Sequence, residues 1–500
     1  MKQEKVCRPL LKNESQSLDK MPPKIIKRTP SLFEALLPIL CLIVMLSTSV
    51  FIYGDNSSYG GNQIALIVCA GIASIIGIKN GYTWKEIESG IVKGISTAMG
   101  AILILLAVGA MIGTWIMSGL VPAMIYYGLN ILSPSIFYFA ACIICALSAL
   151  SIGSSWTVAG TLGAALMGIA VGLGLSPEVT AGAVISGAYF GDKMSPLSDT
   201  TNLAPAVAGT DLFTHINHMI WTTGPSLLIA LCIFLFMGFN AADAQNLGGL
   251  ELIQNTIKDN FNISVLSFVP LVIVFVMAFK KMPAFPTVLI GGLVGGVFAV
   301  ILQPEVVRDF VGETDLPRHL ISLSGVWTAL HSGFSIESGV DIVDDLLSRG
   351  GMSSMLNTVW LVITALTFGA VLETTKLLNT LVKVILSFAK STSSLIITTL
   401  GTCIGINIVT ADQYMAIVLP GRMFKAEFKR RKLAPKNLSR TLEDSATMTS
   451  PLVPWNTCGA FMSASLGIAT FSYLPFCFFN LINPLVALSY ALFNFKIEKI

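Results

Sequence analysis

The chain has 500 residues, of which 54% are hydrophobic and only 12% are charged, and its formal net charge is +3. Soluble domains carry about 25% charged residues, so this composition excludes an ordinary water-soluble enzyme. The small net charge, with the basic residues grouped in short loops, gives no reason to expect a nucleic-acid partner. We therefore expect the lipid bilayer to be the solvent and a partner of this chain.

The N-terminal segment 1–31 carries a run of lysines and arginines ahead of the first apolar stretch. A cleaved signal peptide would place its apolar core nearer the start of the chain. We therefore predict that residues 1–31 form a basic tail in the cytoplasm.

Apolar runs suited to the membrane follow one another through the rest of the chain. They lie at 32–53, 63–78, 96–118, 134–151, 156–174, 178–191, 216–239, 263–280, 284–303, 354–373, 394–411, 412–424, 455–470 and 473–495. A crossing needs about 20 apolar residues, so several of these runs are too short to span alone. The short runs 178–191 and 412–424 adjoin clusters of Gly, Pro, Ser and Thr, which favours broken or re-entrant helices that line a cavity.

Lysine and arginine in the loops indicate the orientation of these runs. The loops 54–62 and 119–133 have none, whereas 79–93 has three and 425–440 has seven. Cytoplasmic loops carry the excess of basic residues, so the last two segments and both chain termini are predicted to be cytoplasmic. The acidic segment 304–353 is predicted to lie outside.

The two halves of the chain also resemble each other, at an offset of roughly 255 to 260 residues. Pro177 corresponds to Pro435, and the Ser-Pro-Leu segment 195–197 corresponds to 450–452. The loop charges place matching segments in opposite orientations across the membrane. Two repeats of opposite topology are typical of secondary transporters, whose substrate site lies where the broken helices of the repeats meet.

The predicted fold class is therefore an all-α polytopic membrane protein with two inverted-topology repeats and broken or re-entrant helices. We divide it into the basic tail 1–31, an N-terminal membrane half 32–260 with the first repeat, and a C-terminal membrane half 261–500 with the second.

The segment 191–205, GDKMSPLSDTTNLAP, is the first candidate site. Pro196 and Pro205 each remove a backbone donor and disfavour helix before them, which predicts unwound backbone between them. Carboxylate, carbonyl and hydroxyl oxygens are the ligands of hard cations. The predicted cation- and proton-binding residues here are Asp192, Ser195, Ser198, Asp199, Thr200, Thr201 and Asn202, with transported Na+ at Asp199. The alternative is that Asp192 and Lys193 form an interfacial loop pair and that the hydroxyls are helix caps.

The matching segment of the second half offers a similar set of oxygens but no carboxylate at the Asp199 position. Its predicted ligands are Thr449, Ser450, Asn456 and Thr457. Asp412 is a further candidate at a predicted helix break, with a helix N-cap as the alternative. The accessory candidates are Lys193, Glu373, Ser154, Ser155 and Thr410, and the alternative for Glu373 is a pair with Lys376 at i+3.

Other polar residues are assigned structural roles. His215 and His218 are expected at interfacial positions, and Glu34, Glu443 and Asp444 as interface or loop charges. No Walker motif or Gly-rich phosphate loop occurs in the sequence, and no histidine accompanies a serine-rich turn. We therefore expect no enzyme activity and no cofactor beyond the transported Na+ and H+.

The segment GDKMSPLSDTTNLAPAVAG, together with GTWIMSGLVPAMIYYGL at 113–129, resembles the NhaC family of Na+/H+ antiporters. The likeness runs from about residue 32 to the C-terminus. It implies an exchanger of the bacterial cytoplasmic membrane with Na+ and H+ as substrates. The same family includes exchangers of protonated malate for lactate and Na+, so a small carboxylate substrate stays open, as does a homodimer.

The expected mechanism is competition, in which Asp199, with Asp192 or Asp412 nearby, binds either a proton or Na+ and is exposed to alternate sides of the membrane. A carboxylate exchanger would need a cation to neutralise its substrate, and Lys193 is the only basic residue inside the first motif. A channel and a membrane-embedded enzyme are the alternatives from other classes.

Overall fold

The computed structural model describes residues 27–241, 247–312 and 316–500. Within that part of the chain the regular elements are helices, apart from a single bridge between Leu433 and Lys499. Most of the predicted basic tail, residues 1–26, lies outside the described residues.

The helices before residue 242 cover the predicted apolar runs, but three of them, 84–97, 120–131 and 199–208, lie in segments that were predicted as loops or unwound backbone. The helices of this part are α1 (Leu32–Tyr53), η2 (Gly54–Tyr59), α2 (Gly61–Lys79), α3 (Trp84–Thr97), α4 (Met99–Met117), α5 (Leu120–Ile131), α6 (Pro134–Ile152), α7 (Ser155–Val158), η3 (Ala159–Gly163), α8 (Ala164–Gly172), α9 (Pro177–Met194), α10 (Asp199–Ala208) and α11 (Leu212–Ala241).

After residue 246 the helices include several short ones. They are α12 (Leu247–Asn260), η5 (Val265–Phe268), α13 (Val269–Phe279), α14 (Ala284–Leu302), α15 (Pro304–Val311), α16 (Arg318–His331), α17 (Asp341–Leu347), η6 (Met352–Met355), α18 (Leu356–Thr374), α19 (Leu377–Ser387), α20 (Thr392–Thr410), α21 (Gln413–Arg430), α22 (Pro435–Leu442), η7 (Glu443–Thr447), η8 (Ser450–Leu452), α23 (Thr457–Leu466), α24 (Thr470–Tyr473), η9 (Leu474–Phe476) and α25 (Phe478–Leu492). The elements η3 and η7 are π-helical turns.

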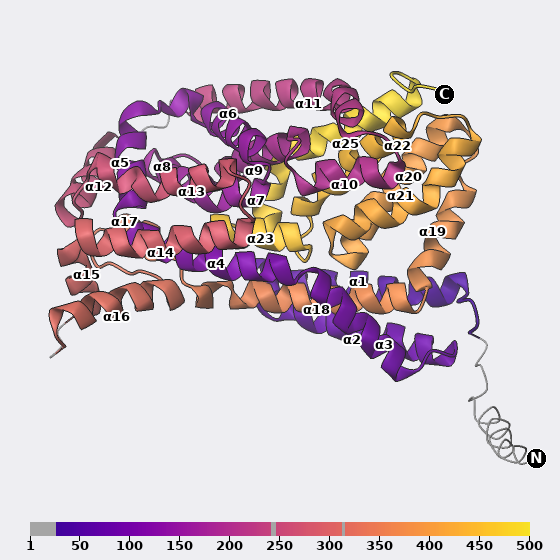
Figure 1. The fold of residues 1–500 in the computed structure, drawn as a ribbon, viewed down its shortest axis with the longest axis horizontal. Helices are drawn as coiled ribbons and strands as arrows, with labels where there is room; N and C mark the ends of the chain where they lie inside the picture. Colours follow the sequence, from indigo (N-terminus) through magenta and orange to yellow (C-terminus); the bar gives the residue numbers. More distant parts are fainter. Residues whose placement is uncertain (1–26, 242–246, 313–315) are drawn as a thin grey trace, which may run out of the picture.

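The long helices run along the longest axis of the molecule (Figure 1). Among the described residues nine are long and apolar enough to cross a membrane, or eleven if each of two bent pairs counts as one span. The bent pairs are 251–260 with 265–279, at 88°, and 457–466 with 470–476, at 89°. These observations confirm an all-α, multi-pass membrane fold with broken helices.

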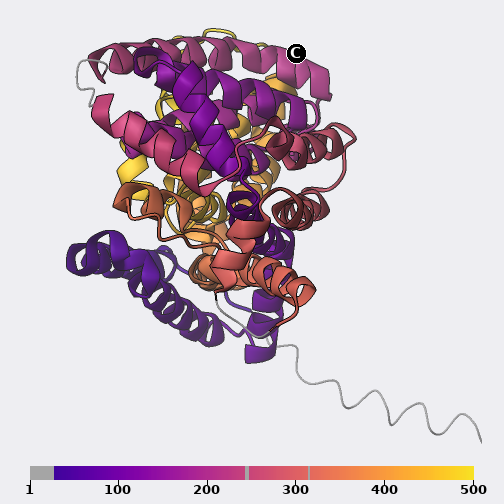
Figure 2. The same ribbon diagram turned by 90° about the vertical axis from the view of Figure 1, so that its left-hand side faces the viewer.

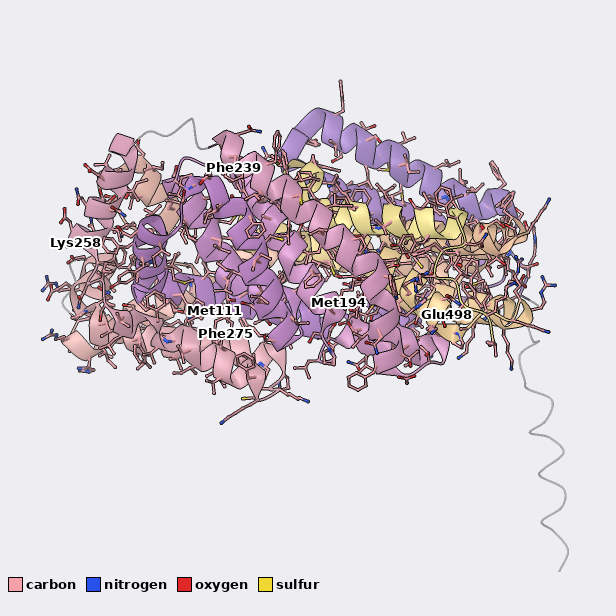
Figure 3. The ribbon with its side chains drawn as sticks, turned by 90° about the horizontal axis from the view of Figure 1, so that it is seen from above. Met111, Met194, Phe239, Lys258, Phe275 and Glu498 are labelled. Atoms are coloured by element: carbon pink, nitrogen blue, oxygen red, sulfur yellow. The ribbon has the colours of Figure 1, made fainter. Side chains whose placement is uncertain are left out.

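Helices α1 to α3 lie on the side of the molecule opposite α11 (Figures 1 and 2). Lys258 lies at one end of the long axis and Glu498 near the other (Figure 3). The backbone N–H of Ala434 donates to the Glu498 carbonyl, and that of Ile500 donates to the Lys432 carbonyl. The described C-terminal residues therefore pack against the most basic segment of the chain.

Helix α1 begins with a capping box, in which Ser31 and Glu34 each accept from the other's backbone N–H. The Glu34 side chain is buried and also pairs with Arg28 and Lys79. Glu34 was predicted to be an interface or loop charge. That prediction was too simple, because the Glu34 side chain fixes the start of the first span.

Helix ends recur in the two halves at a spacing of 258 residues. Both α6 and α20 have 19 residues, and each is followed by one residue in the left-handed region and then by a side-chain N-cap. Pairs at this spacing are Gly153 and Ala411, Ser154 and Asp412, Pro177 and Pro435, Ser198 and Asn456, and Gly209 and Gly467. Helices α4 and α18 match at a spacing of 257 residues, so the spacing falls within the predicted range of 255 to 260, while the opposite orientation of the halves stays a prediction.

One predicted correspondence is displaced by three residues. At a spacing of 258, Ser195, which ends α9, matches Val453, which ends η8, and Pro196 matches Pro454. The match of segment 195–197 to 450–452 was therefore wrong. A Ser-Pro-Leu sequence can occur on either side of a helix end, so the three letters alone do not fix the register.

Helices α6 and α9 pack with backbone against backbone. A Cβ added at Gly187 would overlap the carbonyl oxygen of Cys142, and one added at Gly191 would overlap the carbonyl oxygen of Ala146. Glycines four residues apart on one helix face allow this close approach, which is common between membrane helices.

We expect Gly187→Ala to lower the stability of the folded protein by about 1–3 kcal/mol, because the new methyl group forces the two backbones apart. The measurement is the midpoint of thermal unfolding in detergent. The matched control is Gly224→Ala in α11, where an added Cβ meets no atom within 4 Å. Equal midpoints for both variants would contradict the close packing.

Candidate functional site

The first candidate segment contains a helix break. Helix α9 ends at Met194, residues 195–198 are extended or turn, and Ser198 caps α10 by accepting from the Thr201 backbone N–H. Unwound backbone was predicted between Pro196 and Pro205, but it covers only residues 195–198. Asp199, Thr200 and Thr201 form the first turn of α10, because the Ser198 cap restarts the helix and Pro205 is accommodated inside it.

The second half has the matching break between η8 and α23, where Asn456 caps α23. A further break separates α20 from α21, and there Asp412 is the N-cap, accepting from the Met415 backbone N–H at 2.7 Å. The capping role considered for Asp412 is therefore real. It leaves the second carboxylate oxygen of Asp412 available for another contact.

A cavity of about 700 Å³ adjoins these breaks. Its wall takes polar side chains from both halves of the chain and one lysine from the loop between α13 and α14. The predicted residues that line it are Asp192, Ser198, Asp199, Thr200, Ser154, Ser155, Asp412 and Thr457, joined by Thr157, Gln413, Tyr414 and Lys281. The structure thus brings Asp412 of the second half to the same cavity as Asp192 and Asp199 of the first half.

Asp192 is the most firmly held of the three carboxylates. It is 9% exposed, and Ser155 donates to its Oδ2 from both the backbone N–H, at 3.2 Å, and the hydroxyl, at 2.6 Å. The alternative that Asp192 and Lys193 form an interfacial loop pair is wrong, because both side chains are buried in the last turn of α9. The first turn of α7 and the last turn of α9 are joined at the cavity wall.

Asp199 is exposed to the cavity at the first turn of α10. Its neighbours Ser198 and Thr200 are buried, and their hydroxyl oxygens are 3.2 Å apart. A carboxylate in this position attracts cations into the cavity, whereas Asp192 and Asp412 hold fixed positions in its wall.

Three predicted ligands of the first segment serve the helix break instead. The Thr201 hydroxyl donates to the carbonyls of Asp192 and Lys193, the Asn202 amide donates to the Pro196 carbonyl, and Ser195 Oγ accepts from the Leu197 backbone N–H. None of the three side chains lines the described cavity. Thr201 thus holds the carbonyl end of α9, while Asn202 and Ser195 hold the backbone of the break itself.

The predicted ligands of the second segment divide in the same way. The Thr449 hydroxyl donates to the Ser445 carbonyl, and the Ser450 hydroxyl is near both Gln413 Oε1 and the Thr447 carbonyl. The Asn456 amide donates to the Asn407 carbonyl. Of this set only Thr457 lines the cavity.

Two accessory candidates lie away from the cavity. The Thr410 hydroxyl donates to the Ile406 carbonyl within α20. Glu373 is exposed near the C-terminal end of α18. Lys376 lies beyond that end, in the left-handed region with φ 60°, so the helical i,i+3 geometry considered for this pair is not formed.

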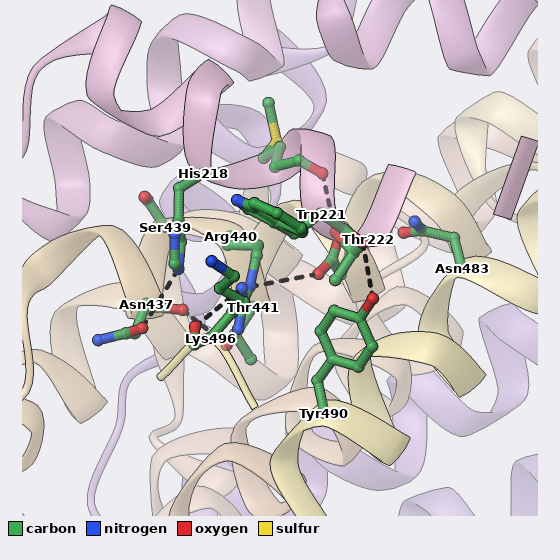
Figure 4. Close-up of polar contacts among 12 residues, drawn as sticks. His218, Trp221, Thr222, Asn437, Ser439, Arg440, Thr441, Asn483, Tyr490 and Lys496 are labelled. Atoms are coloured by element: carbon green, nitrogen blue, oxygen red, sulfur yellow. Dashed lines mark hydrogen bonds and ion pairs between the residues drawn. The ribbon is translucent and has the colours of Figure 1, made fainter. Parts of the chain in front are cut away.

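A buried ion pair was missed by the sequence analysis. Lys193 Nζ lies 2.7 Å from Asp444 Oδ1, and both side chains are 0% exposed. The Thr222 hydroxyl donates to the same oxygen, and Arg440 approaches the second one at 3.9 Å. Figure 4 shows Arg440 and Thr222 in this network, which joins α9, α11 and α22.

The predictions for the charged residues around this pair were wrong. Glu443 and Asp444 were assigned to an interface or a loop, but both are fully buried. His215 and His218 are also buried, and His215 Nδ1 lies 2.9 Å from Ser439 Oγ. His218 Nε2 lies 3.2 Å from Asn437 Oδ1 (Figure 4). The physical reason is that α22 and η7 pack inside the protein, where polar partners on α9 and α11 replace water.

One signal could have revealed the network. A lysine within an apolar helix needs a carboxylate partner, and Asp444 stands four residues after Arg440, just beyond the basic segment 425–440 that is predicted to be cytoplasmic. The segment 425–440 is instead the end of α21, a short turn and most of α22.

The cavity residues suit a cation held mainly by neutral oxygens. Among the described residues no group of three His, Cys, Asp or Glu side chains lies close enough to hold a metal ion alone. A cation at any one of the cavity carboxylates would therefore complete its shell with hydroxyls and carbonyls. Hard cations of low charge accept such ligands.

The profile of the Na+/H+ antiporter family matches residues 187–495 of this chain. The Na(+)/H(+) antiporter NhaC of Alkalihalophilus pseudofirmus is 38% identical over 87% of this chain and 91% of its own length. The chain belongs to the NhaC family of Na+/H+ antiporters. The predicted family resemblance is confirmed, and membership points to a transporter and not to an enzyme.

Other members of the family are similar over most of the chain. The malate-2H(+)/Na(+)-lactate antiporter of Bacillus subtilis is 36% identical over 93% of this chain and 95% of its own length. The arginine/ornithine antiporter ArcD of Halobacterium salinarum is 36% identical over 92% of this chain and 91% of its own length. The names of these similar proteins therefore differ in their substrates, which are Na+ and H+ alone, malate and lactate with H+ and Na+, or arginine and ornithine.

A second cavity, of about 690 Å³, is lined by residues that follow those of the first cavity along α7 and η3 and along α23 in this NhaC-family chain. Thr161 and Ala460 line the second cavity, whereas Trp156 lines the first. The Trp156 ring stacks on Phe461, with ring centroids 4.2 Å apart. The two cavities are thus separated by a few residues of α7, η3 and α23.

Proposed function

We propose that this protein exchanges Na+ for H+ across the bacterial plasma membrane, with the three-carboxylate cavity as the loading site. The observation that carries the proposal is the meeting of Asp192, Asp199 and Asp412 on one cavity wall. A carboxylate binds either a proton or a cation, so occupation by Na+ displaces the proton. Antiport follows from that exclusion.

Alternating access is the transport mode that we propose for this site. Two cavities that follow each other along the same helices support it, since a small rearrangement around Trp156 and Phe461 would change which cavity reaches the carboxylates. Two similar NhaC proteins are named as Na+/H+ antiporters, which supports Na+ and H+ as the substrates.

A malate and lactate exchanger is the second candidate. The volume of the cavity and Lys281 in its wall favour it, because a small carboxylate needs both room and a cation. The residue first considered for that charge, Lys193, is held by Asp444 away from the cavity wall. Three carboxylates against one lysine make the cavity a better site for cations than for anions.

The test is fluorescence quenching in everted vesicles that maintain a proton gradient. The vesicles are challenged in turn with Na+, Li+, K+, lactate, malate and arginine. We expect Na+ alone to dissipate the gradient. A response that requires lactate together with Na+, or arginine without Na+, would replace Na+/H+ exchange with the corresponding organic exchange.

We expect Asp199→Asn to raise the Na+ concentration for half-maximal exchange about fivefold. The Asp199 carboxylate is exposed, so its attraction for a cation is worth about 1 kcal/mol. The measurement is the initial rate of exchange as a function of Na+ concentration in proteoliposomes.

The matched control is Asp211→Asn, which removes the same charge from another exposed helix start, where Asp211 accepts from the Thr214 backbone N–H. The control should behave as the unchanged protein does. An unaltered Na+ dependence in Asp199→Asn would exclude Asp199 from the cation path.

A further inference from the structure

Glu443 is a buried acid whose carboxylate is not satisfied by the surrounding protein. It lies in the π-helical turn η7 and is 0% exposed. Neither Oε1 nor Oε2 has a hydrogen-bond partner among the described residues. An ionised carboxylate in that condition costs several kcal/mol, so the group must take up a proton or a cation.

Charges of both signs lie around Glu443. Lys193 attracts a negative charge on Glu443, while Asp192 repels it. The Lys193 ammonium is already bound by Asp444 at 2.7 Å, so it does not neutralise a second carboxylate fully. The buried titratable and charged side chains on η7 and the helices packed against it are Tyr189, Asp192, Lys193, Cys403, Arg440 and Asp444.

Hydroxyl groups connect Glu443 with the cavity. The turn η7 packs against α10, which carries Thr200, and the Thr200 hydroxyl lies 3.2 Å from the Ser198 hydroxyl at the cavity wall where Asp192 also lies. Thr447 is also near Glu443, although neither threonine makes a hydrogen bond of ordinary geometry with it. A hydroxyl donates and accepts at once, so a proton can pass along such a series.

We propose that Glu443 is a second proton-binding site of this transporter, filled from the cavity through Ser198 and Thr200. When Asp192 gives up a proton to Ser198, Ser198 passes its own hydrogen to Thr200, and Thr200 passes its hydrogen to Glu443. The return to the cavity reverses each transfer. The inference rests on the proposed exchange of Na+ for H+ and adds a proton store behind the loading site.

Infrared difference spectroscopy of the purified protein tests the proton site without relying on transport. We expect the carbonyl band of a protonated carboxyl group at neutral pH, and we expect Glu443→Gln to abolish it. Glu443→Asp should shift the band, which also shows that a folded variant has been measured. The matched control is Glu305→Gln, an exposed position paired with Arg308, which should leave the band unchanged. A band that survives in Glu443→Gln would overturn the proposal.

The route through Thr200 is tested by the exchange of that band into deuterated water. Thr200→Val should slow the band shift at least tenfold, and Thr200→Ser should restore the original rate, since serine keeps the hydroxyl. Equal rates in Thr200→Val and the unchanged protein would overturn the route.

The number of protons moved per Na+ tests whether the Glu443 site takes part in transport. It is obtained from the ion gradients at which net flux stops, and we expect a smaller number in Glu443→Gln than in the unchanged protein. If the unchanged protein exchanged no Na+ for H+, the proposed function would fail while the infrared band still reported on Glu443. An unchanged ratio in Glu443→Gln would separate Glu443 from transport.

Discussion

Asp192→Asn should reduce Na+-dependent proton exchange about 100-fold or more. The asparagine oxygen still accepts both bonds from Ser155, so the join between α7 and α9 persists. What is lost is the buried negative charge, and a cation left without it in the protein interior loses about 3 kcal/mol or more. The measurement is the rate of Na+-driven proton movement in proteoliposomes with a fixed amount of protein.

The chain offers a closely matched control for this variant. Asp344 also accepts from the backbone N–H and the hydroxyl of one serine, Ser338, but it does not line the three-carboxylate cavity. Asp344→Asn should therefore leave exchange within about twofold of the original. Exchange in Asp192→Asn that remained as fast as in this control would remove Asp192 from the mechanism.

Asp444→Asn should be the most destabilising change in the buried network. It leaves the Lys193 ammonium inside the protein without its bound carboxylate, and breaking such a pair from one side costs about 3–5 kcal/mol. Lys193→Met should cost less, because Asp444 then keeps the Thr222 hydroxyl and the nearby Arg440. The midpoints of thermal unfolding in detergent show which of the two variants is less stable.

The double variant Lys193→Met with Asp444→Asn provides the internal control. It contains neither the buried ammonium nor its carboxylate, so its midpoint should lie above that of Asp444→Asn alone. If the double variant were less stable than Asp444→Asn, the broken ion pair would not be the cause of the lower stability of Asp444→Asn. A midpoint for Asp444→Asn equal to that of the unchanged protein would contradict its burial.

The multi-pass helical fold was predictable because hydropathy reports directly on the spans. The helix breaks were also visible, since Pro177 and Pro435 begin helices and the polar segment near Ser198 interrupts an apolar run. The extent of unwinding was not visible. It depends on the Ser198 cap, and a cap restarts a helix at a place that proline positions alone do not reveal.

The site was predictable only in part. Asp192, Asp199 and Asp412 were recognised because carboxylates in apolar surroundings are rare, and all three line the cavity. The burial of Glu443 and Asp444 was not recognised, because hydropathy treats each residue alone. Asp444 can be buried because it pairs with Lys193, which lies 251 residues away in sequence. The polar composition of α22 and η7 therefore suggested a loop.

The glycine contacts between α6 and α9 limit how the protein can rearrange. The backbone of α6 lies against Gly187 and Gly191 of α9 without room for a side chain. If α9 slid along α6 by one residue, about 1.5 Å, larger side chains would collide with the α6 backbone. These two helices should therefore travel as one rigid unit that carries Asp192 with it. The motion that opens the cavity to one side of the membrane or the other must then take place at other helix interfaces, where side chains and not backbones are in contact.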